Sequence, residues 1–222
     1  MANIFDDPAS LLAHFSPAST LSARTLAHYE SHAASYRAGT MDHDVQENIT
    51  ALLDAILLPK PWSILDFGCG PGRDLATFSR LGHRAIGLDG AEKFVAMARA
   101  HSGCDVWQQD FLALDLPARH FDGIFANASL FHLPSSALPT VLSCLARTLK
   151  PSGVLFCSIP RGNDEEGWRG ERYGTYYSWV RWQTLLAAAG FTEIRHFYRP
   201  PDLPRAQQPW LASVWRSNRG PL

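Results

Sequence analysis

The sequence has little excess charge and few cysteines, and both absences exclude classes of protein. Twenty basic and 21 acidic side chains give a net charge of −1 over 222 residues. Without a basic stretch to neutralise phosphates, nucleic acid and anionic membrane surfaces are poor candidate partners, and a small molecule is the expected partner. The four cysteines form no Cys-x-x-Cys pair and lie in apolar stretches, which is typical of reduced thiols. We therefore expect a cytoplasmic protein.

Long apolar runs and internal repeats are also absent. No run approaches the roughly 18 residues that cross a membrane, and the N-terminal stretch carries acids where a signal peptide carries basic residues. Hydrophobic residues make up 46% of the chain, which is enough for one sizeable core. The sequence thus predicts a single domain over residues 1–222 that is neither secreted nor embedded in a membrane, and that acts as a monomer or homodimer.

Hydrophobic spacing predicts a helical segment followed by an alternating one. Apolar residues three and four apart predict two helices between Thr20 and Leu58, separated at Gly39, so residues 1–60 are expected to form an N-terminal helical cap. From residue 61 onward, short apolar strands alternate with helices, which predicts an α/β core with a parallel sheet over residues 61–222. The expected strands are Ile64–Phe67, Ala85–Leu88, Val106–Trp107, Gly123–Ala126 and Val154–Ile159, and the expected helices are Arg73–Leu81, Glu92–Ala100, Ser136–Leu149 and Trp179–Ala189.

The last third of the chain departs from this alternation. Phe191–Tyr198 and Trp210–Trp215 are two apolar strands with a Pro-rich loop and no helix between them, which predicts an antiparallel hairpin. Residues 160–178 are rich in Gly, charge and aromatic side chains, and they are expected to form a lid loop because connections of this length are usually functional.

The most informative motif is a glycine-rich turn after the first strand, Asp66-Phe67-Gly68-Cys69-Gly70-Pro71-Gly72-Arg73. Glycines permit a tight turn and let a ligand approach the backbone at the start of the next helix. The fingerprint of dinucleotide-binding folds needs its third glycine at position 73, where this chain has Arg73. The spacing therefore disfavours a nicotinamide cofactor without excluding it.

Acidic residues follow the next two strands. Leu88-Asp89-Gly90 ends the second strand, where a carboxylate can accept both hydroxyls of a ribose, and Asp110-Phe111 ends the third, where an acid and a ring suit a purine base. Either acid alone is more often a cap at the end of a strand. Together, at successive strand ends, they indicate a nucleoside site.

With these motifs, and with Phe121–His132 and Leu149–Val154, the chain resembles the class I S-adenosylmethionine-dependent methyltransferases of the small-molecule type. The resemblance implies a Rossmann-like three-layer sandwich with a seven-stranded sheet in the order 3-2-1-4-5-7-6 and an antiparallel last strand. It also implies that S-adenosylmethionine binds and leaves as S-adenosylhomocysteine. The cofactor-binding residues it implies are Tyr29, Tyr36, Asp66, Gly68, Cys69, Gly70, Arg73, Asp89, Gly90, Asp110, Phe111 and Asn127. Tyr29 and Tyr36 are seven residues apart on one helical face, so core packing explains them as well as a cofactor cap does.

Candidate residues for the acceptor side are few. His132, five residues after Asn127, is the candidate general base, with hydrogen bonding or packing as its alternative. His43 between two aspartates is a candidate substrate residue or part of a solvated helix cap. Arg161, Trp168, Tyr173 and Tyr177 of the lid are further candidates for substrate contact. His28 and His32 have the spacing of metal ligands, but no third ligand is evident and no metal is expected.

The function predicted from these motifs is methyl transfer to an O, N or S atom of a small polar metabolite. The segment after the fourth strand lacks both the Asn/Asp-Pro-Pro-Tyr motif of nucleic-acid amino-methyltransferases and the glutamate pair of protein arginine methyltransferases. Two alternatives remain at this stage, an NAD(P)-dependent oxidoreductase and a non-catalytic protein that binds S-adenosylmethionine. The oxidoreductase is weakened because none of the three lysines completes a Tyr-x-x-x-Lys motif.

Overall fold

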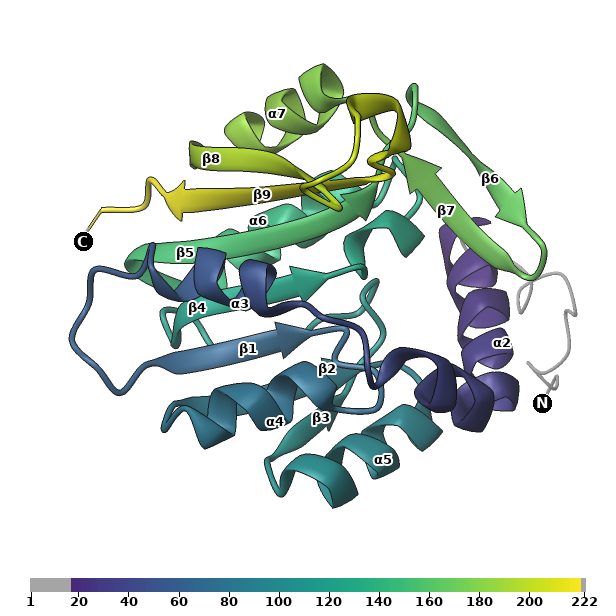
Figure 1. The fold of residues 1–222 in the computed structure, drawn as a ribbon, viewed down its shortest axis with the longest axis horizontal. Coiled ribbons are helices and arrows are strands. Elements are labelled where there is room, and N and C mark those ends of the chain that lie inside the picture. The colour runs from purple at the N-terminus through teal and green to yellow at the C-terminus, as the bar shows by residue number, and fades with distance from the viewer. Residues whose placement is uncertain (1–16, 221–222) are drawn as a thin grey trace, which may run out of the picture.

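A seven-stranded sheet forms the centre of the computed structural model, which describes residues 17–220 (Figure 1). Its strands are β1 (Ser63–Phe67), β2 (Arg84–Asp89), β3 (Val106–Gln108), β4 (Phe121–Asn127), β5 (Leu149–Pro160), β8 (Phe191–Arg199) and β9 (Trp210–Ser217). They lie in the order β3-β2-β1-β4-β5-β9-β8. Counted along the chain among these strands, that order is 3-2-1-4-5-7-6, as predicted. The last strand, β9, runs antiparallel to both β5 and β8, which confirms the C-terminal hairpin.

Helices connect the strands at nearly the predicted positions. They are α2 (Pro17–Thr40), α3 (Gln46–Leu53), α4 (Arg73–Arg80), α5 (Glu92–Ser102), α6 (Leu138–Thr148) and α7 (Trp179–Ala188), with two 3-10 turns, η1 (Leu130–His132) and η2 (Arg205–Gln207). Within the described residues, none of these helices has an apolar stretch of the length that crosses a bilayer.

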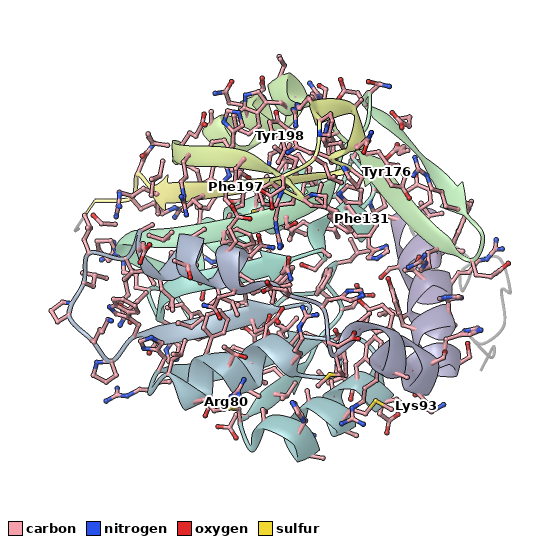
Figure 2. All side chains as sticks on the ribbon, viewed as in Figure 1. Arg80, Lys93, Phe131, Tyr176, Phe197 and Tyr198 are labelled. Atoms are coloured by element: carbon pink, nitrogen blue, oxygen red, sulfur yellow. The ribbon has the colours of Figure 1, made fainter. Side chains whose placement is uncertain are left out.

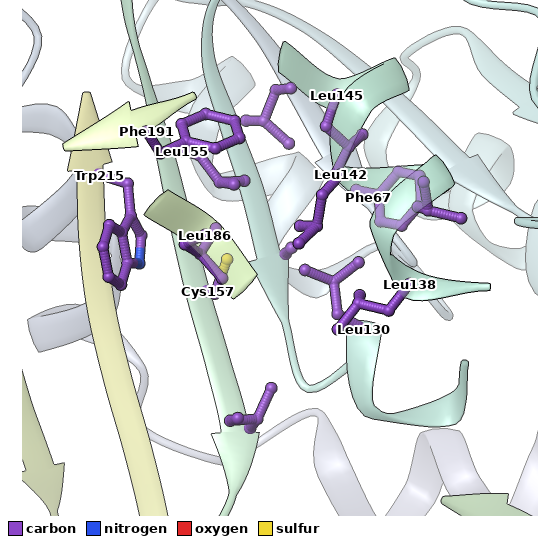
Figure 3. Packing of buried hydrophobic residues seen from close by; sticks show 14 of the residues in the cluster. Phe67, Leu130, Leu138, Leu142, Leu145, Leu155, Cys157, Leu186, Phe191 and Trp215 are labelled. Carbon is purple, nitrogen blue, oxygen red and sulfur yellow. The ribbon is translucent and has the colours of Figure 1, made fainter. Parts of the chain in front are cut away.

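Successive residues of the central strands point to opposite faces of the sheet, and each face is buried by helices. Ile64 and Phe125 pack with α3 and α4 on one face. Leu65 and Ile124 pack with α6 and α7 on the other, where Figure 3 shows the apolar side chains interdigitating. This alternation produces the three layers, because a parallel sheet must be covered on both sides.

The two N-terminal helices have different positions. Ile49 and Leu52 of α3 are buried against β4, β5 and β9, so α3 belongs to one of the helical layers. Helix α2 stands beyond the carboxyl ends of the parallel strands, next to β7 (Arg172–Tyr176), which pairs with β6 (Glu165–Arg169) in a separate two-stranded sheet (Figure 1). Residues 1–16 of the expected N-terminal cap lie outside the described residues.

The expected lid loop over residues 160–178 is wrong in its secondary structure. Strand β5 continues to Pro160, and the segment then forms an antiparallel hairpin of β6 (Glu165–Arg169) and β7 (Arg172–Tyr176). Arg169 pairs with Arg172, so only Gly170 and Glu171 form the turn, and Gly170 has a φ of 63°. A two-residue loop with a glycine at positive φ favours a hairpin, and aromatic cross-strand pairs such as Trp168 and Tyr173 stabilise it. We refer to residues 165–176 as the β6–β7 hairpin.

Candidate active site

The glycine-rich turn between β1 and α4 accepts only glycine at its first position. Gly68 has a φ of 78°, and a Cβ atom placed on it would lie 2.4 Å from Cβ of Ser129 and 3.2 Å from a ring carbon of Phe111. Gly72 is required for another reason, since a Cβ there would lie 2.7 Å from Cα of Ala98 and force α4 and α5 apart. The turn is therefore shaped by close approach to the end of β4 and by helix packing.

A cavity lies over this turn at the carboxyl ends of β1, β2 and β3. We call it the strand-end cavity. It is lined by Ser22, Leu26 and Tyr29 of α2, by Gly68, Gly70, Asp89, Gly90, Asp110 and Phe111 at the strand ends, and by residues near η1 that include Ser129 and His132. The sequence motifs at three successive strand ends thus meet in one place.

Asp89 is held in this cavity by backbone donors. Its carboxylate accepts hydrogen bonds from the amides of Gly70 and Ala91, both at 2.9 Å. Burial nevertheless raises the pKa of Asp89 to about 6, although these amide hydrogen bonds favour its ionised form. A carboxylate has about four acceptor sites, so it can still receive a diol.

Asp110 and Phe111 form the far wall of the strand-end cavity. Asp110 accepts from the Ser22 hydroxyl at 2.9 Å and from the amide of Leu112 at 2.9 Å. The ring of Phe111 stacks on Phe67 with centroids 4.2 Å apart. Ser22 was missed in the sequence, because nothing in a helical stretch indicates contact with a strand end 88 residues away.

Asp66 at the end of β1 and Cys69 in the glycine-rich turn are both buried. Asp66 is 2% exposed and one of its carboxylate oxygens has no hydrogen-bond partner. Burial and the neighbouring charge of Asp74 raise the pKa of Asp66 well above its usual range. Burial likewise raises the pKa of the Cys69 thiol. Cys69 lines the second cavity described next, whereas Asp66 lines neither.

A second cavity lies between α2, the start of α3, β9 and the β6–β7 hairpin, and we call it the hairpin-side cavity. Phe131 and Trp210 give it aromatic walls, and Asn48, Asn127, Ser158, His43 and three arginines, Arg73, Arg172 and Arg199, give it polar ones. Figure 2 places Phe131 beside Tyr176 of the hairpin, and their ring centroids are 6.2 Å apart. The hairpin thus adjoins the cavity through Phe131 of η1.

Most of the polar groups of the hairpin-side cavity have protein partners. Asn48 donates to the Asn127 side-chain oxygen at 3.1 Å, and Asn127 donates to Asp74 at 3.2 Å. Arg73 donates twice to Asp74, at 2.6 and 3.0 Å, and once to the carbonyl of Thr40 at 2.6 Å. This network fixes the orientation of the Asn127 amide. Asn48 and Asp74 are positioning residues that the sequence analysis did not single out.

The arginines differ in how far their charge is neutralised. Arg73 is paired with Asp74, and Arg199 lies 3.2 Å from Glu47. Arg172, at the start of β7, donates to the Tyr29 hydroxyl at 3.5 Å, and it forms no ion pair with an acid among the described residues. Arg172 therefore contributes a cation that remains available at the edge of this cavity.

The two cavities meet at a shared wall formed by Tyr29, Tyr36, Gly68, Gly70 and Ala128. Ala128 follows β4 with a φ of 59°, a strained conformation for a residue other than glycine, and its amide donates to the carbonyl of Ser158 at 2.9 Å. A ligand in each cavity would border these same residues. The arrangement suits a reaction between two bound molecules.

His132 and Tyr29 form a hydrogen-bonded pair at the junction. The Tyr29 hydroxyl lies 2.7 Å from Nε2 of His132, and Nδ1 of His132 lies 2.8 Å from the carbonyl of Tyr173. Burial lowers the pKa of His132 to about 4. The imidazole is thus neutral at ordinary pH.

The remaining aromatic residues of α2 pack on α5. Tyr36 lies edge-on to Tyr29 with centroids 5.4 Å apart, and both rings contact Phe94. Burial raises the pKa of Tyr36 to about 12. Both interpretations of this tyrosine pair agree with the geometry, because the rings pack in a core cluster and also line both cavities.

Four candidate substrate residues of the expected lid do not line either cavity. Arg161 donates to the carbonyls of Arg205 and Gln208, and Trp168 faces Arg24 of α2 at 4.2 Å. Tyr173 turns only its backbone toward the site, and Tyr177 packs on Trp182 in the core. For Trp168 and Tyr173, which pair across the hairpin, the strand pairing explains this, because it turns their shared face away from the cavity.

The two histidines with metal-ligand spacing serve no evident metal site. The rings of His28 and His32 stack with centroids 4.3 Å apart. Among residues 17–220, no three histidine, cysteine, aspartate or glutamate side chains form a group able to hold a metal ion.

Known proteins share this chain's core. A family profile described as "Methyltransferase domain" matches residues 64–153. The trans-aconitate 2-methyltransferase of Azoarcus sp. is 36% identical over 120 residues, which are 53% of this chain and 47% of that protein. A ubiquinone biosynthesis O-methyltransferase of Thiobacillus denitrificans is 35% identical over 106 residues, 45% of each chain. The chain thus spans about half the length of the curated relatives it matches.

A solved structure extends the similarity over nearly the whole chain. The 1,6-didemethyltoxoflavin-N1-methyltransferase of Burkholderia thailandensis, with bound 1,6-didemethyltoxoflavin and S-adenosylhomocysteine, has a TM-score of 0.75 and 24% identity. The match covers 97% of this chain and 94% of the other, and at this identity it shows a shared fold. The glycine cradle, the acids at successive strand ends and the sheet order agree with the profile match, so residues 64–153 of this chain are similar to the methyltransferase-domain family.

Proposed function

We propose that this chain transfers a methyl group from S-adenosylmethionine to an O, N or S atom of a small polar metabolite. The observation that carries the proposal is the shared wall of Tyr29, Tyr36, Gly68, Gly70 and Ala128, where the two cavities meet. When bound, the cofactor supplies a methyl group on a positively charged sulfur. Displacement at that methyl needs a second molecule close by and in line, and two cavities joined at one wall provide such an arrangement.

The strand-end cavity fits the nucleoside part of the cofactor. Asp89 would accept the two ribose hydroxyls, and Asp110 and Phe111 would hold the adenine. Gly68 and Gly70 leave room for the methionine part, since a side chain at Gly68 would collide with Ser129. The unpartnered oxygen of buried Asp66 supports a role in holding the amino group, through a water because Asp66 does not line the cavity.

Four further residues of the predicted cofactor set are divided between the two cavities. Gly90 lines the strand-end cavity, while Cys69, Arg73 and Asn127 line the hairpin-side cavity. We assign Asn127 to the surroundings of the sulfur atom, because its amide is fixed by Asn48 and Asp74 next to the shared wall.

The hairpin-side cavity is the proposed acceptor site. Phe131 and Trp210 suit a planar or ring-containing molecule, and Arg172 and His43 suit a polar or anionic group on it. The relatives named above act, by their names, on trans-aconitate, in ubiquinone biosynthesis and on 1,6-didemethyltoxoflavin. These are small molecules, and they support the same class of acceptor here.

We extend the proposal to the state of the protein. Residues 1–222 would act as one unit, as a monomer or homodimer, without nucleic acid. The four cysteines are unpaired thiols, which supports a cytoplasmic setting. A protein that binds the cofactor without catalysis is the second candidate, because the acids that suit a nucleoside line the strand-end cavity alone.

Thermal unfolding and a labelled-methyl assay test this proposal. Saturating S-adenosylhomocysteine, at about 100 times its Kd, is expected to raise the Tm by about 5 to 10 °C, whereas NAD is not. The Asp89→Asn variant is the control, and its Tm shift should be smaller if the ligand binds in the strand-end cavity. Label transfer from S-adenosylmethionine to carboxylate, phenol and heteroaromatic acceptors would then establish catalysis. A Tm shift with no transfer to any acceptor class would favour the non-catalytic candidate.

A further inference from the structure

The hydrogen bonds of His132 define its tautomer. The carbonyl of Tyr173 can only accept, so Nδ1 of His132, 2.8 Å away, must carry a hydrogen. In the neutral imidazole Nε2 is then an acceptor, and the Tyr29 hydroxyl at 2.7 Å donates to it. The direction of the Tyr29 to His132 hydrogen bond is therefore fixed by a backbone group of the β6–β7 hairpin.

Tyr29 and His132 differ in which cavity they reach. Tyr29 lines both cavities, whereas His132 lines only the strand-end cavity. A molecule in the hairpin-side cavity can contact the Tyr29 hydroxyl, but it reaches His132 only through that hydroxyl. We propose that Tyr29 is the catalytic residue that takes the acceptor's proton, and that His132 is the positioning residue that receives the proton of Tyr29.

The relay conserves atoms and charge for an acceptor that carries an O–H or N–H group. The acceptor's lone pair forms a bond to the methyl carbon, and the carbon–sulfur bond breaks with its electron pair left on sulfur. The acceptor's proton passes to Oη of Tyr29 while the Tyr29 proton passes to Nε2 of His132. The positive charge that leaves sulfur thus reappears on the imidazole, which later releases its proton to water.

The charged groups around the pair favour this order of events. Burial disfavours the charged form of His132, and the nearby charges of Arg172 on β7 and His28 on α2 lower its pKa further. Burial also raises the pKa of Tyr29, while its hydrogen bond from Arg172 acts in the opposite direction. Arg172, 3.5 Å from the Tyr29 hydroxyl, can stabilise negative charge that develops there. His132 is thus neutral before the reaction, with Nε2 free to accept a proton.

The inference rests on the proposed function, and nitrogen NMR of the full chain labelled at its histidines tests it without an identified acceptor. The His132→Asn variant assigns the His132 signals. We expect a neutral imidazole with hydrogen on Nδ1. We also expect the pKa of His132 to be higher by about 1 unit in the complex with S-adenosylhomocysteine than in the complex with S-adenosylmethionine, because only the latter carries a charge on sulfur.

Tyr29→Phe and Tyr36→Phe form a matched pair for this experiment. Both tyrosines lie on α2 and line both cavities, but only Tyr29 contacts His132. Tyr29→Phe should move the Nε2 resonance of His132, and Tyr36→Phe should leave it in place. Hydrogen on Nε2 in place of Nδ1, or equal His132 pKa values in the two complexes, would overturn the relay. Absence of any Tm shift with S-adenosylhomocysteine would instead overturn the proposed function itself.

Discussion

The strand-end cavity and the hairpin-side cavity are neighbours, yet they are built in different ways. The first has its two acids and its glycines at the ends of β1, β2 and β3, where each is placed by the strand before it, and α2 and the segment after β4 complete the lining. The second gathers residues from α2, α3, the end of β4, the β6–β7 hairpin, β8 and β9. A site at the ends of parallel strands can therefore be inferred from local motifs, whereas a site between distant segments depends on how those segments pack.

The cavities also differ in how their charges are held. Asp89 and Asp110 are fixed by backbone amides and by Ser22, which leaves acceptor capacity for a ligand of one kind. In the hairpin-side cavity Arg73 is neutralised by Asp74, and Arg172 is left without an acidic partner among the ion pairs of residues 17–220. The first site therefore offers fixed acceptors, and the second offers a cation that no acid neutralises.

The largest effect is expected from a side chain placed in the glycine turn. Gly68→Ala combines a positive φ with a collision against Ser129, so it should cost about 2 to 4 kcal/mol of unfolding free energy and abolish the Tm shift with S-adenosylhomocysteine. Gly82→Ala is the matched control, because Gly82 has a φ of 83° and a methyl group added there would meet nothing within 4 Å beyond its chain neighbours. It should cost about 1 to 2 kcal/mol and leave ligand binding intact. Equal losses of stability and equal Tm shifts in the two variants would contradict a role of the glycine turn in ligand binding.

Asp89 should control cofactor affinity and its pH dependence. Asp89→Asn is expected to weaken S-adenosylhomocysteine binding by about 10- to 100-fold, or about 1.5 to 3 kcal/mol, through loss of a charged acceptor. Because the pKa of Asp89 is raised to about 6, affinity in the wild-type chain should fall as pH drops below about 6, by at most about tenfold per unit. Calorimetric titration between pH 5 and 8 measures both. A wild-type affinity that does not vary over that range would contradict the ionised role of Asp89.

Asp89 has the opposite pH dependence in the stability of the ligand-free protein, where ionisation of its carboxyl group is unfavourable. Its folded pKa lies above the unfolded value, so the native state binds the proton more tightly than the unfolded chain does. The contribution of Asp89 to stability is therefore present at low pH and is lost as pH rises from about 4 to about 6. Urea denaturation of wild type and Asp89→Asn across this window should show the difference.

Arg172 distinguishes the two cavities by function. Arg172→Met should lower kcat/KM for the acceptor found in the labelled-methyl screen by about tenfold, equivalent to about 1.4 kcal/mol, through loss of a charge-assisted contact. Affinity for S-adenosylhomocysteine should stay within twofold, since Arg172 does not line the strand-end cavity. If Arg172→Met instead weakens S-adenosylhomocysteine binding, Arg172 belongs to the cofactor site and not to the acceptor site.

Tyr177→Phe should have the smallest effect. Tyr177 is 3% exposed, packs on Trp182 and lines neither cavity, so acceptor KM and kcat are expected to change by less than about twofold. Steady-state kinetics with the same acceptor measures this. A tenfold increase in KM would instead support the substrate contact that the sequence analysis predicted for Tyr177.

The strand-end cavity could be predicted from the sequence, whereas most of the hairpin-side cavity could not. The glycine turn, Asp89 and Asp110 could be predicted because each sits at a strand end whose apolar run is visible in the sequence. The β6–β7 hairpin could not, because the charged residues among its aromatics conceal the alternation, although Gly170 between Arg169 and Glu171 is a turn signal. The contact between Tyr29 and His132 joins residues 103 apart, and no local pattern encodes it.

Helix α2 holds the two cavities together by contacts to separate parts of the molecule. It reaches the end of β3 through Ser22 and Asp110, the β6–β7 hairpin through Thr25 and Tyr173, and α5 through Glu30 and Lys93. A ligand in the strand-end cavity lies beneath this helix and adds to the same contacts. We therefore expect release of a ligand from this cavity to require α2 to break several of these contacts, so that the opening of one helix would govern how long the product stays bound.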